Sequence, residues 1–265
     1  MAELRFTILG CGSSGGVPRI GGDWGACDPS NPKNRRRRCS MLVERVTEAG
    51  TTRVLIDTAP DLREQLLDAG VSHLDAVVWT HPHADHLHGI DDLRVVFFHR
   101  RDKLPAYADA ETRARVLEAF GYIFASPPGS NYPPILDLRD IDGPVSVEGA
   151  GGAIRLDPFR VGHGRITALG FRIGGLAYLP DVNTIPDEVW PVLDGLDIWV
   201  LDALRRTPHP SHVHLAEALE WIARAAPARA VLTNMHNDLD YATVAAETPA
   251  NVTPAHDGLV LTLPA

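Results

Sequence analysis

Short apolar segments recur along the whole chain and predict most of its strands. Residues 4–9 alternate and then stay apolar before a run of glycines, which predicts a first strand that leads into a loop. Residues 41–46 and 53–56 predict two further strands, and Glu48-Ala49-Gly50 between them is typical of a β-hairpin turn. Residues 75–80 predict another strand, which is buried.

Apolar positions at helical spacing alternate with these strands. The helix predicted over residues 61–69 is followed by Gly70, which lies where a left-handed residue would end it. The segment from His214 to Ala225 has the pattern of an amphipathic helix. Spacing alone predicts the remaining elements: helices at about 91–101 and 110–120, a short strand near 106, and strands over 149–156, 166–173, 176–179, 197–201 and 228–232.

The order of these elements predicts one domain. Strands and helices alternate in both halves, and no stretch has the composition of a disordered linker or of an internal repeat. Residues 126–134 are expected to form a proline-rich surface loop, and residues 17–39 a long loop of functional character. We therefore predict a single domain over residues 1–265.

Composition narrows the class of protein. Of the 265 residues, 45% are hydrophobic and 22% are charged, which is ordinary for a folded chain with a core. The 34 acidic and 25 basic side chains give a net charge of −9, which argues against electrostatic binding of nucleic acid across the whole surface. Three cysteines without a CxxC pair predict a reducing, cytoplasmic setting, and no apolar run reaches the roughly 20 residues that would span a membrane.

The glycine-rich stretch after the first strand matches two known catalytic motifs in spacing. Gly10, Gly12 and Gly15 have the spacing of a dinucleotide-binding loop, and residues 12–16 fit a nucleophile elbow. Both motifs require a helix to begin there, and Pro18 biases the preceding residue toward extended geometry. A tight turn that brings the backbone close to a site is therefore the preferred interpretation.

The segment THPHADH, directly after the fourth predicted strand, carries the strongest chemical signal. His81 and His83 would share one face of an extended chain, while the turn near Pro82 lets Asp85 and His86 face a second position. Imidazole and carboxylate groups are metal ligands, so two adjacent cations are plausible. A solvated loop with a chance run of histidines is the alternative that this clustering disfavours.

One such segment cannot complete two coordination spheres, because a catalytic zinc usually keeps three or four protein ligands and a water. Three further candidates, His163, Asp181 and His236, each follow an apolar strand. Any one of them alone would more often be an ordinary loop residue. Their common position after strands is what a site at the edge of a sheet requires.

The order of these ligands resembles the metallo-β-lactamase-fold hydrolases over nearly the whole chain. That resemblance implies an α+β fold, the four-layer αβ/βα sandwich of the metallo-β-lactamase type with its metals at one edge. Closer features resemble the branch that contains the phosphoribosyl 1,2-cyclic phosphate phosphodiesterase and is related to tRNase Z. Those features are residues 10–18, 35–40 and 55–57, Asp202, His212, Asp257 and Gly258.

The resemblance implies two divalent ions, with zinc or manganese favoured. It places His81, His83 and His163 on one ion, Asp85, His86 and His236 on the other, and Asp181 between them. A hydroxide held by the ions would then be the nucleophile, so Asp85 and Asp181 count as catalytic residues. The chain offers only Cys27 where the phosphodiesterase carries a cysteine cluster, so no third, structural metal is expected.

Two further roles are implied by the same resemblance. Asp57, at the end of a strand, would orient a ligand histidine, although a hydrogen bond to a turn is nearly as good an interpretation. His212 would protonate the leaving oxygen, which departs poorly as an alkoxide, and His209 and His214 are its close rivals. His214 is expected to face the first turn of the helix that follows it.

Four consecutive arginines, Arg35, Arg36, Arg37 and Arg38, could bind the phosphate of a substrate. Neighbouring residues of an extended segment point alternately, so at most two of the four could reach one ligand. On so acidic a chain, the four form a patch rather than a nucleic-acid interface. His88 is predicted to line the substrate pocket.

The function predicted from these residues is metal-dependent hydrolysis of a small cyclic phosphodiester, either a cyclic nucleotide or a cyclic sugar phosphate. A lactonase or other carboxyl-ester hydrolase on the same metals is one alternative, and a non-catalytic metal-dependent binding protein is another. The long basic insertion of tRNase Z is missing, so large nucleic acids are poor candidates for partners. No membrane partner is expected, and the sequence leaves a homodimer open.

Overall fold

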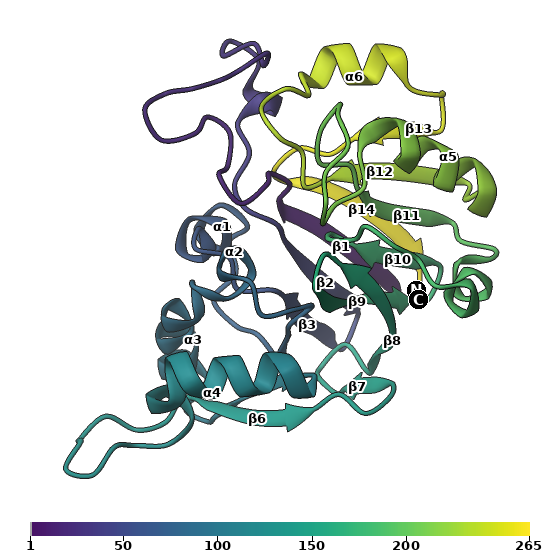
Figure 1. Cartoon of the computed structure of the whole chain (residues 1–265). Helices are drawn as coiled ribbons and strands as arrows, with labels where there is room; N and C mark the ends of the chain where they lie inside the picture. Colours follow the sequence, from purple (N-terminus) through teal and green to yellow (C-terminus); the bar gives the residue numbers. More distant parts are fainter. Residues whose placement is uncertain (1) are drawn as a thin grey trace. The chain divides into compact units, whose positions relative to one another are not determined.

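The computed structural model describes residues 2–265, which divide into two compact units (Figure 1). Within the described residues, unit 1 comprises residues 2–9, Ser40–Arg155 and Val260–Ala265, and unit 2 comprises Gly10–Cys39 and Leu156–Leu259. Each unit is therefore assembled from stretches that are far apart in the sequence. The prediction of one domain over the whole chain stays a prediction.

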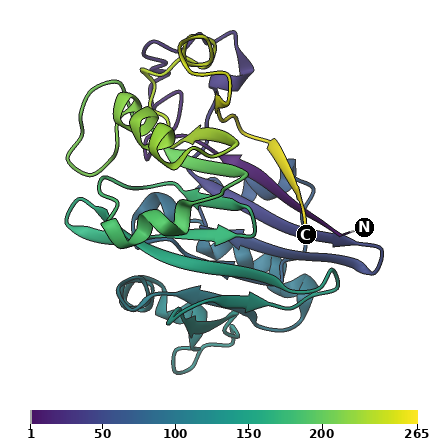
Figure 2. The same cartoon turned by 90° about the vertical axis from the view of Figure 1, so that its right-hand side faces the viewer.

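Unit 1 is built on a sheet in the order β14-β1-β2-β3-β4-β5-β6. Strands β2 and β3 form the antiparallel hairpin that the sequence predicts, and its turn lies near the right-hand edge of Figure 2. Strands β3 to β6 pair in parallel. The bounds are β1 (Glu3–Gly10), β2 (Ser40–Thr47), β3 (Gly50–Ile56), β4 (Ala76–Val78), β5 (Leu104–Ala108), β6 (Leu136–Asp140) and β14 (Leu259–Pro264), with a short β7 (Val145–Val147).

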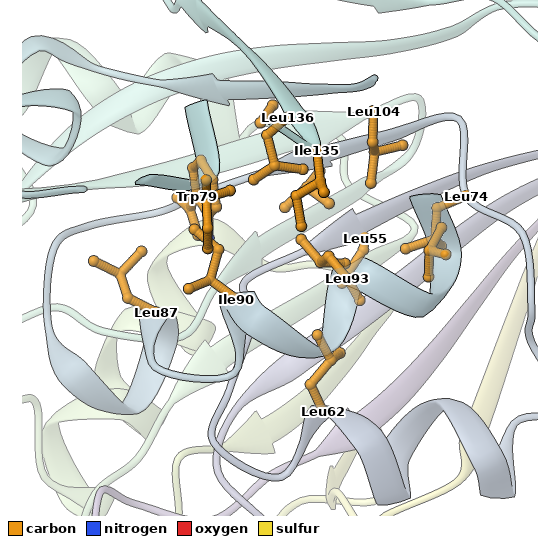
Figure 3. Close-up of a cluster of buried hydrophobic side chains, with 14 of the residues drawn as sticks. Leu55, Leu62, Leu74, Trp79, Leu87, Ile90, Leu93, Leu104, Ile135 and Leu136 are labelled. Carbon is orange, nitrogen blue, oxygen red and sulfur yellow. The ribbon is translucent and has the colours of Figure 1, made fainter. Parts of the chain in front are cut away.

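The helices of unit 1 bury a leucine-rich cluster, whose side chains point toward one another in Figure 3. Trp79, after β4, is fully buried in this cluster, and its indole Nε1 donates to the hydroxyl of Thr58 at 2.9 Å. The cluster includes Leu55, Leu62, Leu74, Leu87, Ile90, Leu93, Leu104, Ile135 and Leu136. The helices are α1 (Leu62–Asp68), α2 (Ala84–Leu87), α3 (Leu93–Arg100), α4 (Ala110–Phe124) and the 3₁₀ turn η2 (Ile90–Asp92).

The strand predicted over residues 149–156 is wrong for its first half. Residues Gly149 to Gly152 instead form a turn, in which the Gly152 amide donates to the carbonyl of Gly149 at 3.0 Å. The amide of Gly151 also donates to the Thr52 hydroxyl at 3.0 Å. A Cβ on Gly151 would lie 2.0 Å from the carbonyl oxygen of Arg45, so this close approach of two backbones needs glycine. Helix α4 also runs to Phe124, beyond the predicted end at residue 120.

Unit 2 holds strands in the order β13-β12-β11-β10-β9-β8. Strands β8 to β10 pair antiparallel, whereas β10 to β13 pair in parallel. Parallel neighbours need a crossover, which the amphipathic α5 supplies between β11 and β12. The bounds are β8 (Ile154–His163), β9 (Ile166–Ile173), β10 (Leu176–Leu179), β11 (Ile198–Asp202), β12 (Arg229–Thr233), β13 (Val252–Pro254), α5 (Leu215–Ala225), α6 (Tyr241–Glu247) and η3 (Asp187–Leu193).

The long loop over residues 10–39 also belongs to unit 2, and both views place it beside α6 (Figures 1 and 2). Asp240 caps α6 by accepting from the Thr243 amide at 2.9 Å, and it accepts from the Asn34 side chain at 2.6 Å. The loop contains the 3₁₀ turn η1 (Pro32–Asn34), but no α-helix begins after Gly15, as a dinucleotide-binding loop would require. Among the described residues, none of the helices has the length and apolar character needed to cross a membrane.

Candidate functional site

Unit 1 brings its four predicted ligands together at the turn between β4 and α2. The Nε2 atom of His81 lies 3.1 Å from Nδ1 of His83. Two nitrogens on one tetrahedral metal with bonds of about 2.05 Å would lie roughly 3.3 Å apart, so this spacing suits two ligands of one ion. Asp85 and His86 follow in α2, with 3.6 Å between the Asp85 carboxylate and His86 Nε2.

Asp57 holds both ends of this turn from the end of β3. Its carboxylate is fully buried, and it accepts from the amide and the hydroxyl of Thr80, each at 2.8 Å. It also accepts from Nδ1 of His86 at 2.7 Å, which leaves Nε2 of that ring as the lone-pair nitrogen. Burial raises the pKa of Asp57, and the His86 imidazole opposes that shift. Asp57 therefore bonds both to the turn and to the ring of His86, while metal binding by His86 stays a prediction.

Gly89 and Thr58 support the ligand turn and were not singled out from the sequence. The Gly89 amide donates to the Thr58 carbonyl at 2.9 Å, and a Cβ on Gly89 would lie 2.0 Å from the carbonyl oxygen of Ala59. Only a residue without a side chain allows this approach. His88 is exposed and packs against the ring of Phe120 at 5.5 Å between centroids, and its substrate contact stays a prediction.

Unit 2 places its ligand candidates at the ends of β8, β10 and β12. His163 Nδ1 is held by the carbonyl oxygen of Ser211 at 2.6 Å, so Nδ1 carries the proton and Nε2 the lone pair. That Nε2 lies 3.5 Å from the carboxylate of Asp181, a spacing close to that of two ligands on one ion. The side chain of Asn234 donates to the other Asp181 oxygen at 3.3 Å.

His212 is fixed by a carboxylate of its own. Asp202 is fully buried and accepts from His212 Nδ1 at 2.8 Å and from the Val182 amide at 3.1 Å. Burial raises the pKa of Asp202 to about 7, against the opposing effect of His212. Because Nδ1 is committed to Asp202, Nε2 is the nitrogen that His212 presents outward. The Asp181 carboxylate is only 3.8 Å from His212 Nδ1.

The two rivals of His212 have other partners. His209 Nδ1 accepts from the hydroxyl and the amide of Ser211, at 3.2 and 3.3 Å. Burial, then His212, lowers the pKa of His209. His214 stands at the start of α5 with Nδ1 3.3 Å from the carboxylate of Glu217, which is the first-turn orientation that the sequence predicts. His212 is thus the member of the trio that is oriented by a buried carboxylate.

His236 is anchored through its backbone after β12. Its amide donates to the carbonyl of Leu204 at 2.8 Å, and its ring Nδ1 lies 3.4 Å from the carboxylate of Asp238. The other ring nitrogen, Nε2, contacts the guanidinium of Arg19. Burial and then Arg19 lower the pKa of His236. Arg19 carries no motif signal in the sequence and was not predicted.

The structure contradicts the prediction of phosphate binding for one of the four consecutive arginines, Arg36. Arg36 is 2% exposed, and its guanidinium donates to the carbonyls of His236 at 3.1 Å and Leu239 at 2.6 Å. This side chain ties the loop to the segment after β12, so it is not available to a substrate. For Arg35, Arg37 and Arg38, phosphate binding stays a prediction.

A comparison with known families adds to this geometry. Residues 52–235 match the family model of the β-lactamase superfamily domain. The chain belongs to this superfamily. A crystal structure described as a new diphosphatase from the PhnP family matches with a TM-score of 0.88 and 36% identity, over 99% of this chain and 98% of that one. This identity, over nearly the full length of both chains, shows that the protein also belongs to the PhnP family.

Two further relatives are informative. Zn²⁺-bound PqqB from Methylobacterium extorquens shares the fold with a TM-score of 0.72, at 20% identity over 97% of this chain and 99% of that one. An octanoyltransferase of Porphyromonas gingivalis strain W83 is 35% identical over 237 residues, which are 88% of this chain and 46% of that protein. The chain thus spans about half the length of this curated relative.

These similarities confirm the α+β metallo-β-lactamase-type sandwich and give the superfamily member a metallo-hydrolase fold. The donor set of each unit fits a divalent metal. His86 and His163 each hold Nδ1 against an oxygen acceptor, which directs the Nε2 lone pair outward. Neutral imidazole and carboxylate are the ligands that zinc, manganese and iron accept.

Proposed function

We propose that this protein is a metal-dependent phosphodiester hydrolase that acts on a small substrate such as a cyclic nucleotide or a cyclic sugar phosphate. The observation that carries the proposal is the His212–Asp202 pair beside Asp181. An alkoxide leaving group needs a proton, and an oriented imidazole next to a candidate metal ligand can supply it. An activated ester would not need this pair.

The proposal assigns two divalent ions, zinc or manganese, to the ligand sets that family resemblance implies. These are His81, His83 and His163 for one, Asp85, His86 and His236 for the other, and Asp181 for both. When bound, the ions would lower the pKa of water toward neutrality and neutralise charge on the phosphoryl group. Asp57 and the Ser211 carbonyl would keep His86 and His163 in the tautomer that binds metal.

In the same proposal, the proton moves from Nε2 of His212 to the leaving oxygen. Asp202 stabilises the protonated ring, because its buried carboxylate accepts from Nδ1 throughout. The Asn234 side chain, 3.2 Å from the same Nδ1, steadies Asp181 by a hydrogen bond to its other oxygen. In this proposal, Asp202 thus orients the proton donor His212, and Asp181 binds the metal ions.

A carboxyl-ester hydrolase is the second candidate. It is favoured by the relative called an octanoyltransferase, because that name denotes chemistry on an acyl group. That name describes a protein of which this chain spans 46%, so its acyl chemistry could belong to the other half. A non-catalytic binding protein is the third candidate. It would retain the metals without turning over any ester.

The test compares wild type with Asp181→Ala on bis-p-nitrophenyl phosphate, a cyclic nucleotide panel and a simple lactone, each with added zinc or manganese. We expect phosphodiester turnover that the substitution abolishes, together with about two bound ions per wild-type chain by elemental analysis. Asp187→Ala is the matched control, because that carboxylate in unit 2 is 99% exposed. Turnover of the lactone alone would contradict the proposal, and about one ion or none would contradict the dinuclear site.

A further inference from the structure

Arg19 lies at the base of a small hairpin in the long loop of unit 2. Its amide donates to the Asp23 carbonyl at 2.9 Å, and the Gly22 amide donates back to the Arg19 carbonyl at 3.0 Å. Ile20 at the tip is fully exposed, and a Cβ on Gly21 or Gly22 would meet nothing within 4 Å. The tip therefore has no packing partner, whereas the Arg19 side chain turns back into the unit.

That side chain ends on the ring of His236. The guanidinium of Arg19 contacts Nε2, while Nδ1 of the ring faces the carboxylate of Asp238 at 3.4 Å. A guanidinium has donors and no acceptor, so Nε2 must be the lone-pair nitrogen and Nδ1 must carry the proton. Arg19 thus occupies the lone pair that a metal ion would use.

A guanidinium and a divalent cation cannot share one lone pair, because like charges at this separation repel strongly. Binding of an ion to His236 would therefore displace Arg19. Within residues 2–265, no carboxylate forms an ion pair with Arg19. Arg205, which also acts on His236, differs because its guanidinium is held by the carbonyls of Thr207 at 3.0 Å and Pro208 at 2.6 Å.

We infer that Arg19 is a substrate-binding residue, which exchanges the His236 lone pair for a phosphoryl oxygen of the substrate when the metal binds. Its planar fork of donors matches two oxygens of a phosphate, and the long flexible stem of an arginine lets the guanidinium move while the backbone bonds of the hairpin base stay in place. The identity of the anion rests on the proposed function, whereas the exchange with metal rests on the Arg19–His236 contact alone. The four-arginine segment is not needed for this role.

Two readouts on Arg19→Gln test the inference. In calorimetric titrations of metal-free protein with zinc, we expect several-fold tighter binding, because the competing cation is gone. On bis-p-nitrophenyl phosphate we expect KM to rise at least tenfold with kcat changed much less, because a charge-assisted contact to the bound substrate is lost. Arg19→Lys keeps the charge and should recover part of both effects, and Arg224→Gln, an exposed arginine of α5, should change neither.

The outcomes separate this inference from the proposed function. Wild-type affinity for zinc in Arg19→Gln, or a wild-type KM, would overturn the exchange. If the wild-type enzyme hydrolyses no phosphodiester, the proposed function fails, but the affinity of zinc-loaded protein for inorganic phosphate still tests Arg19. Weaker phosphate binding by Arg19→Gln would then support its role as an anion ligand, and equal binding would overturn it.

Discussion

The two units hold their candidate ligands in different ways. In unit 1, four candidate ligands fall within six consecutive residues, and one buried carboxylate, Asp57, bonds to both Thr80 and His86. In unit 2, the ligands come from separate strand ends, and each imidazole has a partner of its own. Those partners are the Ser211 carbonyl for His163, Asp202 for His212 and Asp238 for His236.

This difference predicts which single substitutions should disturb several candidate ligands and which should disturb only one. A change at Asp57 removes the common support of a whole ligand turn. A change at one partner in unit 2 leaves the other two imidazoles oriented. Unit 2 can therefore assign separate chemical tasks to its histidines, as the proposed division between metal binding and proton donation requires.

Among substitutions that spare the candidate metal ligands, the largest expected effect on catalysis belongs to His212→Ala. On a phosphodiester with an alkyl leaving group, we expect kcat to fall by about 10²–10⁴, because no other group donates the proton. On bis-p-nitrophenyl phosphate the fall should be small, since p-nitrophenolate leaves without protonation. His214→Ala is the matched control, and a larger loss there than in His212→Ala would reverse the assignment of the acid.

The next effect is expected from Asp57→Asn. The amide preserves the shape of the side chain and tolerates the φ of +64° at this position, but it loses the charge that orients His86. We expect metal affinity and turnover to fall by about 10–100-fold, measured by zinc titration and by kcat. Asp142→Asn, an exposed carboxylate of the same unit, should leave both unchanged. A loss no greater than that of Asp238→Asn would remove the contrast between the units.

The smallest effect on catalysis is expected at Asp257, which supports the loop of unit 2 rather than a ligand. It accepts from the amides of Cys11 at 3.2 Å and Arg37 at 2.8 Å, and burial raises its pKa to about 6. Because this pKa lies above the unfolded value of 3.8, the group contributes stability below about pH 4 that is lost as the pH rises through about 6.

The measurement is the free energy of unfolding in denaturant between pH 4 and 7, with a chelator present. The free energy of unfolding of the wild type, minus that of Asp257→Asn, should decrease as the pH rises from 4 to about 6 and should then level off. A difference that does not vary with pH would show that Asp257 does not titrate as its burial implies.

Much of this molecule could be predicted from the sequence where interactions are local. The hairpin of β2 and β3 follows from a short-range pattern, and its prediction is confirmed by the fold. The strand β4 before the candidate ligand turn follows from such a pattern too, while metal binding by that turn stays a prediction. The strand predicted at 149 failed because three glycines there pack against Thr52, a contact that no local period records. The burial of Arg36 and the reach of Arg19 to His236 join residues about 200 positions apart, so composition alone could not reveal them.

The pairing of β1 with β14 has a consequence for chain architecture. These strands are neighbours in one sheet, and the Ala265 amide donates to the carbonyl of Ala2 at 3.2 Å, so the two termini lie side by side (Figure 1). Adjacent ends allow a chain to be rejoined by a short linker and reopened elsewhere, or joined to another protein, with little disturbance of its core. An appended domain would be tethered at one corner of unit 1 whether it preceded or followed this sequence, so gene fusions in either order would be structurally equivalent.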